Sequence, residues 1–232
     1  MHNFCRNTNS GTLFIEFSNK NSQLAGYYLS KIVYLILAMF IYLIRHGQTT
    51  GDIEDRYGGD YDDDLTKLGR TQSERLAKSL QKAGIETIYA SPLKRAKQTA
   101  TILSTQLSIP LEVIEGFKER NSYGVLTGLI KSEALERYTD QVSLLDDVHN
   151  TIQGGESYET FKKRITHALS SIIQDQSANK RLGLVTHGGP ITLIFREILG
   201  RGEVKVGDCG YALLEAREND FIVHKLKGIE PK

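Results

Sequence analysis

The sequence of 232 residues contains only two cysteines, Cys5 and Cys209, and they lie far apart. So few cysteines exclude a framework of several disulfides, and their separation is not the ligand spacing of a zinc site. Chains that use cysteine so sparingly are typical of a reducing compartment. We therefore expect a cytoplasmic protein that contains no structural metal.

The sequence also lacks an excess of charge of either sign. Lys and Arg together number 29, and Asp and Glu together number 28, which gives a formal net charge of +1. A balanced charge provides no overall attraction to nucleic acid or to a polyanionic surface, so we expect no nucleic-acid partner. Any preference for an anion must come from a local cluster of cations. The oligomeric state is left open.

The first 38 residues differ in composition from the rest of the chain. Polar stretches rich in Asn and Ser precede an apolar run that extends from residue 27 to residue 44. A run of this length suggests a transmembrane helix or a signal peptide. Residues 40–44 are needed, however, as a strand that leads into the functional motif. We therefore expect an extension over residues 1–38, a single α/β domain over 39–232, and no membrane attachment.

The apolar run ends abruptly at a cation, an imidazole and a glycine. Residues 40–44 are β-branched, aromatic or aliphatic with no polar break, which is typical of a strand buried on both faces of a parallel sheet. Arg45, His46 and Gly47 follow directly, and such sheets bind ligands at this end of their strands. Thr49 can add a hydrogen bond. The stretch indicates an anion pocket that contains a histidine, and a solvated loop is the alternative.

The same order of strand, histidine and glycine recurs near the C-terminus. Residues 182–186 have the pattern of a buried strand, and His187 and Gly188 follow it. An apolar helix is expected over residues 191–199. Two separate strand and helix units thus place a histidine at the same edge of the sheet, which two unrelated core histidines would rarely do.

An arginine is expected near the two histidines. Residues 85–90 resemble a further buried strand, and Ser91 and Pro92 are typical of an N-cap and a first helical turn. The apolar residues of this helix form one stripe, so Arg95 in its first turn points away from the core and stays near the strand end. A solvated surface arginine is the alternative.

Two polar loops and a terminal hairpin remain to be assigned. A third strand is expected over residues 111–114, and Glu119 lies in the polar loop beyond it as a candidate proton donor. The loop over residues 52–64 is rich in Gly and Asp. Its spacing lacks the alternation and the distal glutamate of a calcium loop, so we expect a solvated active-site loop. A terminal hairpin is expected from residues 209–216 and 221–226.

Six motifs in this order resemble the histidine phosphatase superfamily. They are Arg45-His46-Gly47-Gln48-Thr49, Leu65-Thr66-Lys67-Leu68-Gly69, Ser91-Pro92-Leu93-Lys94-Arg95-Ala96, Glu119-Arg120 with Tyr123-Gly124 and Gly128, Gly155-Glu156-Ser157, and Thr186-His187-Gly188. The resemblance extends from about Met39 to the terminal hairpin. It implies a three-layer α/β/α sandwich with a mostly parallel central sheet, of the phosphoglycerate mutase-like type.

The resemblance also implies a role for each site residue. His46 is similar to the family's nucleophile, and Glu119 to its general acid and base. The implied phosphate pocket consists of Arg45, Arg95, His187, Thr49 and Gly188. No metal and no other cofactor is implied, because arginine pairs with phosphate oxygens and a neutral imidazole can attack phosphorus. The expected ligand is a small phosphorylated substrate.

One departure from the family pattern bears on this pocket. The family usually has an asparagine three residues after the threonine of the first motif, where this chain has Asp52. A carboxylate there would add negative charge near a phosphate dianion unless it turned away or were protonated. The sequence leaves the effect of Asp52 open.

Three activities fit these motifs: a phosphatase, a cofactor-dependent phosphoglycerate mutase, and a non-catalytic phosphate-binding module. All core positions are filled, which disfavours the third. The stretch from Glu119 to Gly128 resembles the mutases. We favour the phosphatase for two reasons. The segment between Gly128 and Gly154 is shorter than the mutases' insertion, and Gly188-Gly189-Pro190 follows the second histidine as in the phosphatases.

Overall fold

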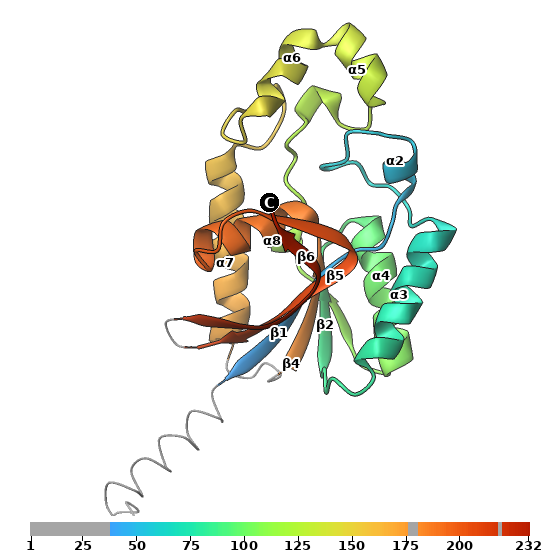
Figure 1. The fold of residues 1–232 in the computed structure, drawn as a ribbon, viewed down its shortest axis with the longest axis vertical. Helices are drawn as coiled ribbons and strands as arrows, with labels where there is room; N and C mark the ends of the chain where they lie inside the picture. Colours follow the sequence, from blue (N-terminus) through green and yellow to red (C-terminus); the bar gives the residue numbers. More distant parts are fainter. Residues whose placement is uncertain (1–37, 176–180, 218–219) are drawn as a thin grey trace, which may run out of the picture. The chain divides into compact units, whose positions relative to one another are not determined.

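The computed structural model describes residues 38–175, 181–217 and 220–232. Apart from Ala38, the expected extension lies outside the described residues. No helix of the described part combines the length and the hydropathy that a membrane-spanning helix needs. The described residues are organised around a six-stranded sheet with the strand order β3-β2-β4-β1-β5-β6 (Figure 1).

The central sheet is mostly parallel, as expected. In chain order its strands are β1 (Met39–Arg45), β2 (Thr87–Ala90), β3 (Leu111–Val113), β4 (Arg181–Thr186), β5 (Val204–Ala216) and β6 (Phe221–Pro231). Strand β4 pairs in parallel with β1 and β2, and β2 pairs in parallel with β3. Strand β5 is antiparallel to both of its neighbours, β1 and β6. The terminal hairpin is therefore present and is longer than the sequence predicts.

Helices cover both faces of this sheet (Figure 1). The helical elements are α2 (Thr50–Ile53), α3 (Lys67–Leu80), α4 (Lys94–Leu107), η1 (Glu115–Phe117), η2 (Gly124–Leu126), α5 (Lys131–Arg137), α6 (Thr139–Ser143), η3 (Leu144–Asp146), α7 (Tyr158–Gln174), α8 (Gly188–Leu193) and the π-helical η4 (Ile194–Ile198). One apolar core lies between the sheet and α3 and α4, and the other lies between the sheet and α7 and α8. The three-layer α/β/α sandwich is confirmed.

Local capping chemistry sets some helix starts and not others. Thr66 and Ser157 cap α3 and α7, since each side-chain oxygen accepts a hydrogen bond from the backbone N–H three residues later. Helix α4 has no side-chain cap and begins at Lys94, after Leu93. The prediction that Ser91 is its N-cap is wrong. The helix predicted over residues 191–199 begins three residues earlier, as α8.

The loop after β1 packs against the start of α3 too closely to admit side chains. A Cβ on Gly47 would lie 2.5 Å from the carbonyl oxygen of Gly69, and a Cβ on Gly69 would lie 2.1 Å from the carbonyl oxygen of Gln48. Glycine is therefore required at both positions. The N–H of Gly47 also donates to Oγ1 of Thr99 on α4, at 3.1 Å. Two helices thus fix the loop that carries His46.

A small cap, residues 121–157, lies over the carboxyl ends of the strands (Figure 1). It contains η2, α5, α6 and η3. Leu126, Ala134 and Ile152 of the cap form an apolar cluster together with Tyr57 from the loop after α2. The cap therefore has a core separate from the two cores of the sandwich.

Arg120 attaches this cap to the sandwich. It is only 5% exposed, and its guanidinium donates to the carbonyl oxygens of Val148 at 2.6 Å, Glu156 at 3.0 Å and Asn150 at 3.2 Å. The guanidinium also lies over the ring of Tyr158, 5.6 Å from its centroid. A single buried side chain therefore holds the second half of the cap through its backbone.

Candidate active site

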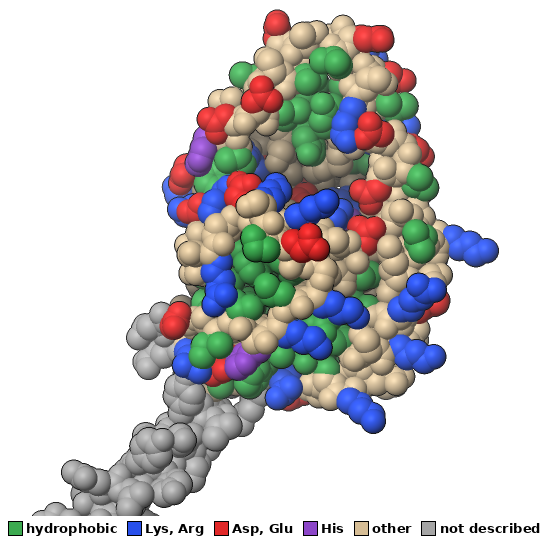
Figure 2. All heavy atoms as spheres, in the orientation of Figure 1, with side chains coloured by type: hydrophobic (Ala, Val, Ile, Leu, Met, Phe, Trp, Pro, Cys, Tyr) green, Lys and Arg blue, Asp and Glu red, His purple; other side chains and the backbone are tan. Residues whose placement is uncertain are grey.

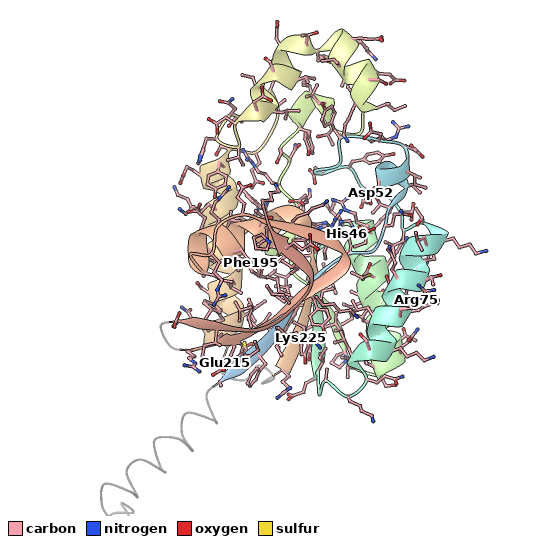
Figure 3. The ribbon with its side chains drawn as sticks, viewed as in Figure 1. His46, Asp52, Arg75, Phe195, Glu215 and Lys225 are labelled. Atoms are coloured by element: carbon pink, nitrogen blue, oxygen red, sulfur yellow. The ribbon has the colours of Figure 1, made fainter. Side chains whose placement is uncertain are left out.

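The register of the two central parallel strands brings the two predicted histidines together. Arg45 of β1 pairs with Thr186 of β4, so the next residues, His46 and His187, emerge side by side. Their ring centroids are 5.1 Å apart, and both side chains are buried. Figure 3 shows His46 at the end of the sheet that faces the cap.

The tautomer of His46 follows from its partners. Nδ1 lies 2.8 Å from the carbonyl oxygen of Gly47, which can only accept, so Nδ1 carries the hydrogen. Nε2 then has the lone pair, and Nε of Arg95 lies 3.3 Å from it. Burial holds the pKa of His46 well below its ordinary value, and the charges of Arg95 and Arg45 lower it further. His46 is therefore a neutral imidazole with its lone pair on Nε2.

His187 has the opposite tautomer. The Nε–H of Arg95 donates to Nδ1 at 3.2 Å, and Nε2 lies 2.6 Å from Oγ of Ser91, to which it donates. Burial lowers the pKa of His187 well below its ordinary value, and the charge of Arg95 adds to the effect. Ser91 orients this ring, a role that its resemblance to a helix N-cap concealed. The sequence contains one signal for this role, because Ser91 follows β2 directly and so lies at the same edge of the sheet as the histidines.

Arg95 lies beside both histidines, as the sequence predicts. It is buried, however, whereas the sequence predicts that it points away from the core. It is only 4% exposed, and both of its terminal nitrogens are bonded to the loop over residues 52–64. Nη1 donates to the carbonyl of Tyr61 at 2.5 Å and to Oδ1 of Asp63 at 2.9 Å, and Nη2 donates to the carbonyl of Gly59 at 2.8 Å. The expectation of a solvated loop is therefore wrong for Asp63, which is buried.

Arg45 has an unused donor inside the site. Its Nη1 donates to the carbonyl of Val206 at 2.6 Å and lies 3.5 Å from Oδ1 of Asp208. Its Nε is buried and has no hydrogen-bond partner within the described part of the chain. A buried donor without an acceptor is costly, so this N–H marks a position where an oxygen of a ligand would be stabilised.

Glu119 is placed as a carboxyl that can retain its proton. Oε1 accepts from the N–H of Arg120 at 2.8 Å, and Oε2 accepts from the N–H of Gly189 at 3.0 Å. Burial raises the pKa of Glu119 above its ordinary value, although these two bonds and the nearby arginines oppose the rise. A Cβ on Gly189 would lie 2.1 Å from Oε1, so a side chain at this position would displace the Glu119 carboxyl group.

Thr49 and Asp52 form a capping box at the start of α2. The N–H of Thr49 donates to Oδ2 of Asp52 at 2.8 Å, and the N–H of Asp52 donates back to Oγ1 of Thr49 at 3.2 Å. Oδ1 of Asp52 lies 4.0 Å from Nη2 of Arg45. The Asp52 carboxylate therefore faces this arginine.

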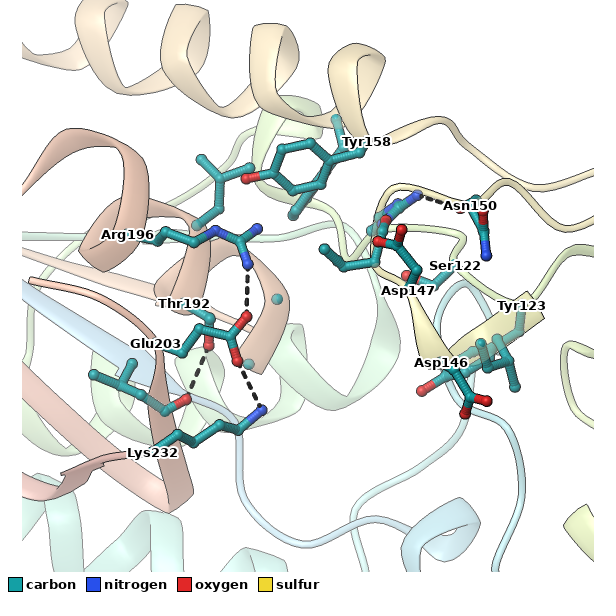
Figure 4. A pocket seen from close by; sticks show the side chains of 18 of the residues that line it. Ser122, Tyr123, Asp146, Asp147, Asn150, Tyr158, Thr192, Arg196, Glu203 and Lys232 are labelled. Carbon is teal, nitrogen blue, oxygen red and sulfur yellow. Dashed lines mark hydrogen bonds and ion pairs between the residues drawn. The ribbon is translucent and has the colours of Figure 1, made fainter. Parts of the chain in front are cut away.

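A pocket of about 930 Å³ extends from this site beneath the cap. Arg45, Gly188 and Gly189 are among the residues that line it. The surface is hollowed here, with charged side chains around the opening (Figure 2). Figure 4 shows Arg196, Glu203 and Lys232 on one wall and Asp146, Asp147 and Asn150 on the facing wall. The pocket has room for an organic group attached to an anion that binds beside Arg45.

Known proteins are similar to this chain in sequence and in fold. The chain is 35% identical over 164 residues to the metal-independent phosphoserine phosphatase of Arabidopsis thaliana, covering 68% of each. It is 31% identical over 158 residues to the uncharacterized phosphatase PhoE of Bacillus subtilis (strain 168), covering 68% of this chain and 76% of that protein. The solved structure of Bacillus stearothermophilus YhfR matches with a TM-score of 0.74 and 25% identity, covering 82% of this chain and 96% of that chain.

The model of the histidine phosphatase superfamily (branch 1) matches residues 41–227. This range includes the cap and the site residues Arg45, His46, Arg95 and His187. The match extends over most of the chain, and the paired strands at its centre deliver the two histidines to one edge of the sheet. The protein therefore belongs to the histidine phosphatase superfamily.

Proposed function

We propose that this phosphatase hydrolyses phosphomonoesters through a phosphohistidine on Nε2 of His46. The proposal rests on one observation above the others: the hydrogen bond from Nδ1 to the carbonyl of Gly47 leaves the Nε2 lone pair facing Arg95 and His187. In the first step Nε2 forms a bond to phosphorus while the bond from phosphorus to the ester oxygen breaks. The neutral imidazole supplies the electron pair.

Glu119 is proposed to move the protons. In the first step its carboxyl donates a proton to the departing ester oxygen, which leaves as an alcohol. In the second step the resulting carboxylate accepts a proton from water as the water oxygen attacks the phosphohistidine. Phosphate leaves, and His46 and Glu119 return to their original states. The raised pKa of Glu119 supports this role, because the group must carry a proton at the start of each cycle.

The phosphoryl group is proposed to bind between Arg45, Arg95 and His187. A phosphoryl oxygen would accept from the free Nε–H of Arg45, and another would replace the histidine nitrogens as acceptor for Nε of Arg95. Charge-assisted bonds of this kind contribute about 1.5–3 kcal/mol each. The dianion would also raise the pKa of His187, so that its Nδ1 gains a proton and donates. Gly188 and Thr49 are proposed to border this pocket.

The substrate is proposed to be a small phosphorylated metabolite, and the name of the Arabidopsis relative gives phosphoserine as the substrate of that protein. Phosphate release in the presence of EDTA is expected, because imidazole and guanidinium groups supply the nucleophile and the cations. Within the described residues there is no group of three or more His, Cys, Asp or Glu that could hold a metal ion.

A panel of phosphomonoesters tests the proposal. It should include phosphoserine, 3-phosphoglycerate, 2,3-bisphosphoglycerate and nitrophenyl phosphate, and it should measure phosphate release and isomerisation separately. We expect phosphate release to dominate and to stop in His46→Ala. Isomerisation of 3-phosphoglycerate without net release would favour the mutase. Binding of phosphate by the wild-type protein without turnover of any ester would favour the non-catalytic module.

A further inference from the structure

We propose that Asp63 is a positioning residue that fixes Arg95 for phosphoryl transfer, an inference that rests on the proposed function. Asp63 belongs to a run of three aspartates in the loop between α2 and α3. Asp62 and Asp64 are exposed, whereas Asp63 is 6% exposed. Carboxylates are almost never buried unless they are paired, so the burial of Asp63 calls for a partner.

The partner is Arg95, and the contact is buried on both sides. Oδ1 of Asp63 lies 2.9 Å from Nη1 of Arg95, and the two side chains are 4% and 5% exposed. Oδ2 accepts from the N–H of Gly51 at 3.2 Å. Each oxygen of this carboxylate therefore has a partner, and the carboxylate links the start of α2 to the arginine on α4.

This arrangement decides which nitrogen of Arg95 can reach a substrate. The carbonyls of Gly59 and Tyr61 and the carboxylate of Asp63 take up Nη1 and Nη2. Only Nε faces His46 and His187, at 3.3 and 3.2 Å. Two of the three loop acceptors are backbone atoms, so Asp63 is the only side chain among them. A change at this position therefore tests the orientation of Arg95 without touching the substrate.

The charge of Asp63 matters as much as its hydrogen bonds. A buried guanidinium without a counter-ion is strongly unfavourable, so loss of the carboxylate favours movement of Arg95 toward solvent or toward the histidines. A displacement of about 1 Å in a positioned group can reduce the rate by roughly 10²-fold. Asp63 therefore contributes to catalysis through Arg95 and not by contact with the reacting atoms.

A double-mutant cycle tests this inference through kcat/KM. Asp63→Asn should reduce kcat/KM by roughly 10²-fold, and in an Arg95→Met background it should cause no further loss. Asp64→Asn is the matched control, because it makes the same change at the adjacent exposed aspartate, and its kcat/KM should stay within about twofold of wild type. An Asp63→Asn enzyme within twofold of wild type, or the same loss in both backgrounds, would overturn the inference.

Thermal unfolding provides a second measurement that needs no turnover. Asp63→Asn and Arg95→Met each leave a buried charge unpaired, so each should lower the Tm by roughly 10 °C. The double variant should melt above either single variant. Additive losses of Tm would overturn the pairing even if Asp63→Asn proved too unstable for kinetics. A wild-type protein without phosphatase activity would refute the proposed function and leave this result standing.

Discussion

Replacement of Glu119 by glutamine removes a titratable proton while it nearly preserves the side chain's shape. The two carboxyl oxygens of Glu119 accept separate bonds from the N–H groups of Arg120 and Gly189. Glutamine has one carbonyl oxygen, so only one of these bonds can persist. The loss of one such bond costs about 1 kcal/mol, which corresponds to a Tm lower by roughly 2–4 °C. The variant should therefore be folded at the temperature of the assay.

The effect on the rate should be much larger and should depend on the leaving group. A positioned general acid typically contributes about 10²–10⁴-fold, or roughly 3–5 kcal/mol of the barrier. Phosphoserine releases an alkoxide that needs this proton, so its kcat should fall by about that factor in Glu119→Gln. Nitrophenyl phosphate releases a stable phenolate, and its kcat should fall by less than about tenfold.

Steady-state kinetics of both substrates across pH provide the assay. Activity requires neutral His46 and, for alkyl esters, protonated Glu119. It should be lost as the pH falls through the lowered pKa of His46 and as the pH rises through the raised pKa of Glu119. Glu112→Gln makes the same change at an exposed position of β3 and should leave the kcat for both substrates unaffected. Equal losses for the two substrates in Glu119→Gln would refute the assignment of this residue as the acid.

Asp52→Asn removes a charge that lies 4.0 Å from Arg45, so the KM for a phosphate dianion should fall by about 2–5-fold at low salt, with kcat little changed. An unaltered KM would show that this charge does not reach the phosphate. His46→Ala should abolish turnover together with acid-labile phosphate on the protein, and turnover without such phosphate in the wild type would argue against a covalent intermediate. Activity should persist in EDTA; complete loss that a divalent ion restores would contradict this. A chain that begins at Met39 should be as active as the full chain, and an inactive product would refute the proposed domain boundary.

The sheet and its paired histidines could be predicted because strand patterns are local. The apolar runs that end at Arg45 and Thr186 show where β1 and β4 end, and parallel pairing then places the next residues together. Nothing beyond hydrophobic pattern and strand direction is needed for this step. The position of Arg95 follows in the same way from the end of β2, although its burial does not.

The residues that hold the site in place could not be predicted in this way. Which of the three aspartates is buried depends on the path of an irregular loop. Such a loop has no hydrophobic periodicity from which the burial of Asp63 could be predicted. Ser91 satisfies the local rule for an N-cap, but its hydroxyl bonds to His187, a residue 96 positions away in the sequence. In both cases a tertiary partner overrides a local preference.

The attachment of the cap by Arg120 has a consequence for how the substrate specificity of this protein could change. All three acceptors of the guanidinium are backbone carbonyls, at Val148, Asn150 and Glu156. Every amino acid presents the same carbonyl, so the attachment is indifferent to the side chains at these positions. Side chains of the cap that line the pocket, such as Leu144 and Leu145, can therefore be exchanged while the hydrogen bonds of Arg120 stay intact. Selection or design can diversify the wall of the pocket without disturbing the histidines and arginines at the edge of the sheet.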